Sequence, residues 1–126
     1  MNHSKLKSVI SWTLQILLAA FYALAAYGKL ISRPQWIALF RNWGFPERFY
    51  LVVGVLELFG AIGLLIPRLV GYAAVGLIVL MIGAAATHLL TGEGLQVLRP
   101  LIAIVFLALV VYLRRPWASR NKKREH

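Results

Sequence analysis

Three ionisable residues lie within or at the ends of long apolar segments, where a charged group is costly. Glu57 interrupts the otherwise uncharged stretch from Phe49 to Ile66, eight residues after its start. At ~1.5 Å per residue it lies roughly 12 Å along a helix, too deep for its short side chain to reach water. An ionisable group in a membrane helix costs about 2.5–3.5 kcal/mol on insertion scales. Glu57 must therefore be protonated, paired or turned toward a hydrated cavity, and each option directs it into a helix bundle.

Lys29 and His88 lie near the ends of two other apolar segments. Because consecutive membrane spans alternate in direction, Lys29, Glu57 and His88 are predicted in the same half of the membrane. Lys29 either pairs with Glu57 or extends to the membrane surface, and His88 either joins them or lies at the interface beside Thr87. Together these three residues form the candidate ligand-binding or intramembrane polar site, and the sequence identifies no catalytic residue.

The composition excludes several kinds of chemistry. The chain has no cysteine, which rules out disulfides, thiolate metal ligands and thiol catalysis. It has four acidic residues, all Glu, so a hydrolytic pair of carboxylates is not expected. No phosphate-binding loop, dinucleotide fingerprint or metal-ligand spacing is present, and a lone His88 does not predict a metal site.

The apolar segments predict an all-α integral membrane protein. Hydrophobic residues make up 60% of the 126-residue chain, against about 45–50% in soluble domains. A membrane-spanning helix needs ~20 mostly apolar residues, and four segments approach or exceed that length: residues 9–31, 49–66, 69–90 and 95–113. The first is longer than the apolar core of a signal peptide, so it is predicted to remain as a span. We therefore expect one membrane domain over residues 1–126, a four-helix bundle.

Small and polar residues within the spans predict how the helices pack. Close approach of helices in lipid favours small residues, so Gly60, Gly63, Gly76 and Gly83 are predicted to mark packing faces. Gln15 is predicted to form a hydrogen bond between helices.

The connections differ in length. Only Pro67 and Arg68 separate the second and third spans, which predicts a tight hairpin. The longer connection after the first span contains Trp36, Phe40 and Trp43 at i, i+4 and i+7, a spacing typical of a short amphipathic helix in the membrane interface. Such a helix could cap the bundle or form a surface for a partner protein. The alternative is that this segment is only a membrane-anchored loop.

The charge distribution predicts orientation. Of the 14 Lys and Arg residues, nine fall on the side of the two termini and five on the other side. Positive residues are retained in the cytoplasm, so both termini are predicted to be cytoplasmic. The basic tail, residues 114–126, could bind nucleic acid or anionic lipid, but orientation alone accounts for its charge, and no nucleic-acid partner is expected.

Several motifs resemble those of a known family. The stretch Gly54-Val55-Leu56-Glu57-Leu58-Phe59-Gly60-Ala61-Ile62-Gly63-Leu64-Leu65-Ile66-Pro67-Arg68 resembles the second helix of the DoxX-like family of small four-helix membrane proteins. Tyr27-Gly28-Lys29-Leu30 resembles the end of their first helix, and Thr87-His88 with Arg99-Pro100 resembles their third-to-fourth transition. The resemblance covers roughly residues 10–115. It implies a multi-pass protein of the bacterial cytoplasmic (inner) membrane, with Lys29, Glu57 and His88 as its polar site.

Three functions are compatible with these observations. The first is a membrane subunit of a redox complex that binds quinone near Glu57, a role that some members of the resembled family have. It requires no covalent cofactor, and its partners are the lipid bilayer and other membrane or peripheral redox proteins, with a homo-oligomer also compatible. The second is a small proton-coupled transporter. The third is a structural or assembly partner in which Glu57 fixes helix packing and no catalysis occurs.

Overall fold

The computed structural model describes residues 2–114, which contain helices and no strand. The helices are α1 (His3–Leu30), α2 (Pro34–Asn42), α3 (Phe49–Leu64), α4 (Val70–Leu90), the short 3₁₀ helix η1 (Gly94–Val97) and α5 (Leu98–Leu113). The all-α prediction is therefore confirmed. The basic tail from residue 115 onward lies outside the described residues.

Within residues 2–114, three helical segments are long and apolar enough to cross a membrane. They are His3–Leu30, Val70–Leu90 and Gly94–Leu113. The predicted fourth span corresponds to η1 followed directly by α5, with Pro100 in the first turn of α5, where its missing N–H is tolerated. The predicted second span is the shorter apolar helix α3, whose 16 residues extend roughly 24 Å.

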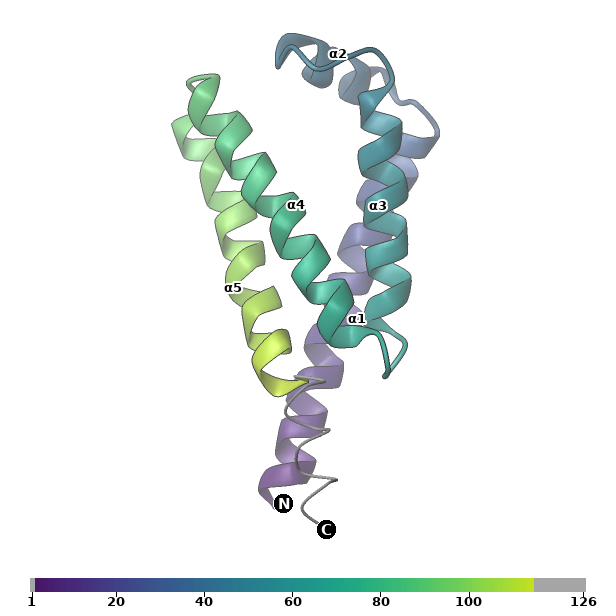
Figure 1. Ribbon diagram of the computed structural model, residues 1–126, viewed down its shortest axis with the longest axis vertical. Helices are drawn as coiled ribbons and strands as arrows, with labels where there is room; N and C mark the ends of the chain where they lie inside the picture. Colours follow the sequence, from purple (N-terminus) through teal and green to yellow (C-terminus); the bar gives the residue numbers. More distant parts are fainter. Residues whose placement is uncertain (1, 115–126) are drawn as a thin grey trace.

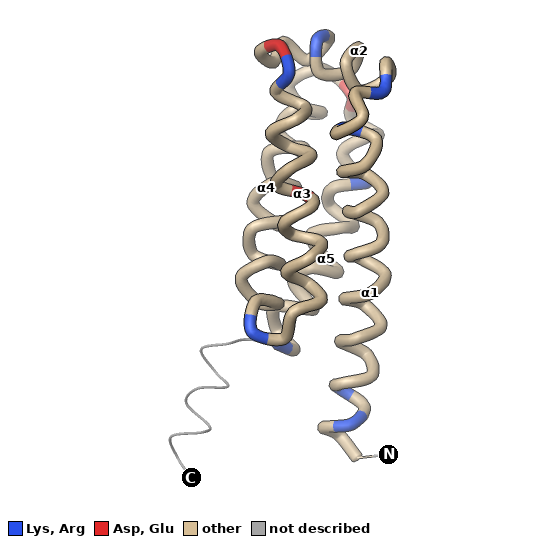
Figure 2. Tube along the Cα trace, turned by 90° about the vertical axis from the view of Figure 1, so that its right-hand side faces the viewer, with Lys and Arg blue, Asp and Glu red and all other residues tan. Residues whose placement is uncertain are grey.

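The helices are arranged as two antiparallel pairs. α1 packs along α3, and α4 packs along α5. The pairs meet where α3 turns into α4, and they diverge toward the opposite end, where α2 lies (Figure 1). We call these the terminal end and the α2 end, because α1 begins and α5 ends at the first of them. Lys and Arg residues gather toward the two ends and leave a long, mostly uncharged middle (Figure 2).

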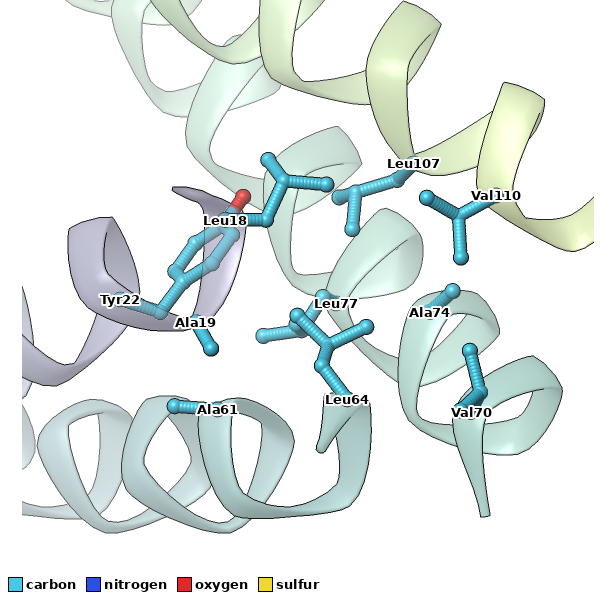
Figure 3. Packing of buried hydrophobic residues seen from close by; sticks show 10 residues of the cluster. All are labelled: Leu18, Ala19, Tyr22, Ala61, Leu64, Val70, Ala74, Leu77, Leu107 and Val110. Atoms are coloured by element: carbon cyan, nitrogen blue, oxygen red, sulfur yellow. The ribbon is translucent and has the colours of Figure 1, made fainter. Parts of the chain in front are cut away.

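The apolar core lies where the four long helices meet, toward the terminal end (Figure 3). Its buried members are Leu18, Ala19, Tyr22, Ala61, Leu64, Val70, Ala74, Leu77, Leu107 and Val110. Many large apolar side chains face outward instead; Leu24, Phe59 and Val79 are 73%, 66% and 63% exposed. A soluble protein would not leave so much apolar surface open, so these side chains indicate contact with lipid.

Two glycines of α3 bring it close to α4. A Cβ atom at Gly60 would lie 2.5 Å from Leu77 Cδ2, and one at Gly63 would lie 2.7 Å from Ala73 Cβ. The prediction that Gly60 and Gly63 mark a packing face is therefore confirmed. The same prediction for Gly76 and Gly83 of α4 is wrong, because a Cβ at either position would meet nothing within 4 Å.

A buried polar network joins three helices at the terminal end. Gln15 of α1 donates from Nε2 to the Leu64 carbonyl at the end of α3 (2.8 Å), which confirms its predicted role between helices. The Ser11 hydroxyl donates to Gln15 Oε1 (2.6 Å), and Arg114 Nε donates to Ser11 Oγ (2.8 Å) and Gln15 Oε1 (3.1 Å). This network connects α1, the end of α3 and the end of α5 on the terminal side of the core.

Helix α2 lies across the other end. It starts at Pro34, a favoured first helical residue, and the chain leaves it through Gly44 at φ 87. Phe40 is buried and packs its ring against Phe49 and Tyr50 at the start of α3. The amphipathic helix therefore exists as predicted, and of the open alternatives it takes the role of a cap.

Candidate functional site

The centre of the candidate site is a buried ion pair between α1 and α3. Lys29 Nζ lies 2.7 Å from Glu57 Oε1, and the two side chains are only 6% and 4% exposed. Lys29 is in the last turn of α1, and Glu57 is in the middle of α3. Of the alternatives open for Lys29, the structure contains the pairing with Glu57 and not the extension to the surface. An ionisable group so far from water is stabilised by such a partner.

Two glycines make room for the pair. A Cβ at Gly54, one turn before Glu57, would lie 3.0 Å from Lys29 Cβ, so α3 approaches α1 closely at this level. A Cβ at Gly28 would lie 2.9 Å from Trp36 Nε1. Larger residues at either position would push α3 or α2 away from the lysine.

Trp36 covers the ammonium from the side of α2. Lys29 Nζ lies 3.8 Å from the centroid of the Trp36 ring, well within the ~6 Å of a cation–π contact. The chain reverses between α1 and α2 through Ser32, which has a φ of 56 and accepts a hydrogen bond from the Tyr50 hydroxyl (3.0 Å). The sequence predicted that Trp36 lies on an interfacial helix but did not predict that it contacts Lys29. That contact depends on the chain reversal at Ser32.

Tyr22 adds a third buried polar group. It is fully buried, and its hydroxyl has no hydrogen-bond partner among the described residues. Tyr22 precedes Lys29 by seven residues, about two helical turns, so the two lie on one face of α1. Sequence analysis missed Tyr22 because tyrosine is common in membrane helices; its i, i+7 spacing from Lys29 is the signal that could have found it.

His88 does not join this pair among the described contacts. Its Nδ1 lies 3.4 Å from Glu93 Oε1, and its ring packs edge-on against Trp43 at 5.4 Å between centroids. Trp43 Nε1 and Thr91 Oγ1 also donate to Glu93 Oε1, at 2.6 and 2.8 Å. These four residues form a separate group, the Glu93 cluster, which connects the end of α2 to the end of α4 where the two helix pairs diverge.

The hydrogen bonds to Glu93 make the contribution of this cluster to stability depend on pH. Donation by Thr91, by Trp43 and more weakly by His88 lowers the pKa of Glu93 below its ordinary value. A carboxyl group with a lowered pKa stabilises the folded state above its unfolded pKa, and this contribution disappears as the pH falls through the folded pKa.

We expect Glu93→Gln to lower the thermal unfolding temperature at neutral pH and to have less effect as the solution is acidified below pH ~4, the range in which Glu titrates. Unfolding in detergent, followed by circular dichroism between pH 7 and pH 3, measures this difference. Trp43→Phe removes one donor and should reproduce part of it. A difference between wild type and Glu93→Gln that stays constant over the whole range would contradict this assignment.

Comparisons with known proteins place most of the chain in one family model. A family model described as the DoxX-like family matches residues 13–112, which include α2, α3 and α4, Lys29, Glu57 and His88, and nearly all of α5. No curated protein and no solved structure matches the chain.

Proposed function

The chain belongs to the DoxX-like family, and we propose that it is the membrane subunit of a quinone-linked redox complex, with the head-group site at Lys29 and Glu57. The observation that carries this proposal is the unused hydrogen-bonding capacity of the buried pair. A lysine ammonium has three N–H donors, and a carboxylate has several acceptor positions. The described contacts account for one ammonium–carboxylate contact and for the Trp36 face. Among residues 2–114, the Tyr22 hydroxyl has no hydrogen-bond partner.

A quinone fits these unused groups chemically. Its ring is flat and apolar, its two carbonyl oxygens accept hydrogen bonds, and sites for such ligands are mostly apolar with a few polar groups. Lys29 would donate to one carbonyl oxygen and Trp36 would pack on the ring. Because the pair is almost fully covered, Trp36 is the group that must move for a head group to enter.

The lipid-facing side of α3 offers a place for an apolar tail. Leu51, Val52, Val55 and Leu56 form a shallow, open apolar groove on the outer face of α3. Leu56 precedes Glu57 directly, so this groove and the ion pair lie on neighbouring faces of one helix turn. A ligand with a polar head and a long hydrocarbon tail could reach both.

The proposed role of the pair is to handle protons. Conversion of a quinone to a quinol consumes two electrons and two protons; the partner protein supplies the electrons, and water supplies the protons through ionisable side chains of the site. Glu57 would carry a proton to a carbonyl oxygen and be reprotonated, while Lys29 would hold that oxygen and balance the charge on Glu57. The requirement for an electron donor makes a membrane or peripheral redox protein the expected partner.

We place the protein in a bacterial cytoplasmic membrane with both termini in the cytoplasm. The excess of Lys and Arg on the terminal side supports this orientation. The α2 end, with Trp36 over the pair, then faces the outer side of the membrane.

A structural role is the second candidate. It is favoured by the short distance within the pair, its burial and the close fit at Gly28 and Gly54. On this alternative, Lys29 and Glu57 hold α1, α2 and α3 together as a docking unit for other subunits, and no ligand enters.

Co-purification separates the two candidates. We would purify the tagged protein from native membranes in mild detergent and extract and quantify the bound quinone, comparing the wild type with Lys29→Gln and Glu57→Gln. Lys7→Gln is the matched control, because Lys7 is an exposed lysine of the same helix. The proposal predicts bound quinone in the wild type and in Lys7→Gln and its loss in the other two. If the wild type contains no quinone, or if all four proteins contain equal amounts, quinone binding at the pair is contradicted and the structural role is supported.

A further inference from the structure

A polar cavity at the α2 end contains charged groups that the ion pair does not use. Its volume is about 520 Å³, within the ~300–1,000 Å³ of small-molecule sites. It lies between α2 and the start of α3, and its polar lining consists of Arg41, Glu47, Arg48 and Tyr50. Phe40, Phe45, Pro46 and Ile37 supply its apolar walls.

The charged residues of this pocket have no partner in the part of the chain that the structure describes. Among residues 2–114, no hydrogen bond or ion pair involves the side chain of Arg41, Glu47 or Arg48, although all three line the same space. Two arginines and one glutamate, all three exposed to solvent, therefore line one open pocket without forming an ion pair with one another. A ligand that satisfies all three needs an anionic group and, next to it, a cationic one.

We propose that this cavity, the Arg41–Arg48 pocket, binds the phosphoethanolamine head group of a membrane phospholipid. The planar guanidinium groups of Arg41 and Arg48 match a phosphate, which each can bind through two parallel N–H bonds. Glu47 accepts from the primary ammonium of the same head group. The choice of a lipid follows from position. The pocket is lined by residues of α2 and of the segment before α3, and α2 lies at the end of the bundle (Figure 1), where head groups border the membrane.

The backbone at Arg48 supports the assignment. Arg48 has a φ of 67, a left-handed conformation that side chains with a Cβ adopt at a cost. It precedes α3 directly, so a glycine would relieve the strain here. Strained residues of this kind concentrate at ligand sites, and Arg48 is one of the residues that line the pocket. The proposal is independent of quinone binding.

Lipid binding to the full chain in detergent tests the pocket by native mass spectrometry. Phosphatidylethanolamine, phosphatidylglycerol and phosphatidylcholine with identical acyl chains are titrated separately, together with soluble phosphoethanolamine. The variants are Arg41→Gln, Glu47→Gln and Arg48→Gly, and Arg48→Gly keeps the backbone conformation while removing the charge. Arg68→Gln, an exposed arginine at the terminal end, is the control.

We expect the wild type and Arg68→Gln to prefer phosphatidylethanolamine over both other lipids. Arg41→Gln and Arg48→Gly should weaken that binding by about tenfold or more, as expected for loss of a charge-assisted hydrogen bond. Glu47→Gln should reverse the preference toward the anionic phosphatidylglycerol, because only the phosphate contacts remain. Equal affinity for the three lipids, or no loss in either arginine variant, would overturn the site. Binding of soluble phosphoethanolamine as tight as that of the lipid would overturn the assignment to a lipid.

Discussion

Replacing Lys29 with methionine is expected to lower the free energy of unfolding by about 3–5 kcal/mol, because it leaves Glu57 buried without its partner. Methionine preserves most of the volume of lysine, so the loss reports the missing charge rather than a cavity. Reversible unfolding in mixed micelles, with increasing fractions of sodium dodecyl sulfate, measures it. Lys7→Met, at an exposed position of α1, should change the free energy of unfolding little.

The double variant separates the pair from its surroundings. Lys29→Met combined with Glu57→Leu removes both charges, and a buried ion pair can often be replaced by apolar residues at little cost. We therefore expect the double variant to recover most of the stability that Lys29→Met loses. A Lys29→Met protein with wild-type stability, or a double variant less stable than the single one, would contradict the pairing.

Tyr22→Phe is expected to act in opposite directions on stability and on ligand binding. The Tyr22 hydroxyl is buried and has no hydrogen-bond partner within residues 2–114, and such a group costs about 1–3 kcal/mol in proteins. Its removal should therefore stabilise the ligand-free protein. If a bound quinone accepts a hydrogen bond from this hydroxyl, Tyr22→Phe should also weaken quinone binding by up to about tenfold.

The matched control is Tyr72→Phe, because Tyr72 is 59% exposed on α4. Its unfolding free energy and its quinone affinity should both stay near wild type in the same micelle and titration experiments. If ligand-free Tyr22→Phe is less stable than the ligand-free wild type, the Tyr22 hydroxyl makes a hydrogen bond in the folded protein, and the prediction is wrong. Unchanged quinone affinity would remove Tyr22 from the proposed site.

The sequence predicted pairing as one of three options for Glu57, beside protonation and a hydrated cavity, because a buried carboxylate in a membrane helix has few ways to be stabilised. A carboxyl group eight residues inside an apolar helix has no route to water, and Lys29 was the cation at the matching depth. Depth along a helix follows from residue number alone, so this argument needs no tertiary structure.

His88 shows the limit of that argument. Residue number predicted the depth of His88 in the membrane, in the same half as Lys29. It says nothing about the position of His88 within the membrane plane. The two helix pairs diverge toward the α2 end, so α4 carries His88 away from α1 and toward Glu93 and Trp43 (Figure 1). Lateral position also decides the wrong prediction for Gly83, where a Cβ would meet no atom within 4 Å.

The contact between Trp36 and Lys29 could not be predicted from residue spacing. Its position over Lys29 depends on the left-handed turn at Ser32 and on the absence of a side chain at Gly28. Serine is not a residue that predicts a positive φ, so the direction in which α2 returns over α1 could not be deduced from the sequence.

The most direct test of the central claim, that a quinone head group binds at the Lys29–Glu57 pair, uses Trp36 as its reporter. Replacing Trp12, Trp43 and Trp117 with phenylalanine leaves Trp36, 3.8 Å from Lys29 Nζ, as the single tryptophan. Quinones quench tryptophan fluorescence on contact, so titration with a short-chain quinone in lipid nanodiscs measures occupancy beside the pair. We predict saturable quenching that Lys29→Gln and Glu57→Gln abolish and Lys7→Gln preserves. Linear, non-saturating quenching that is the same in all four proteins would contradict the claim.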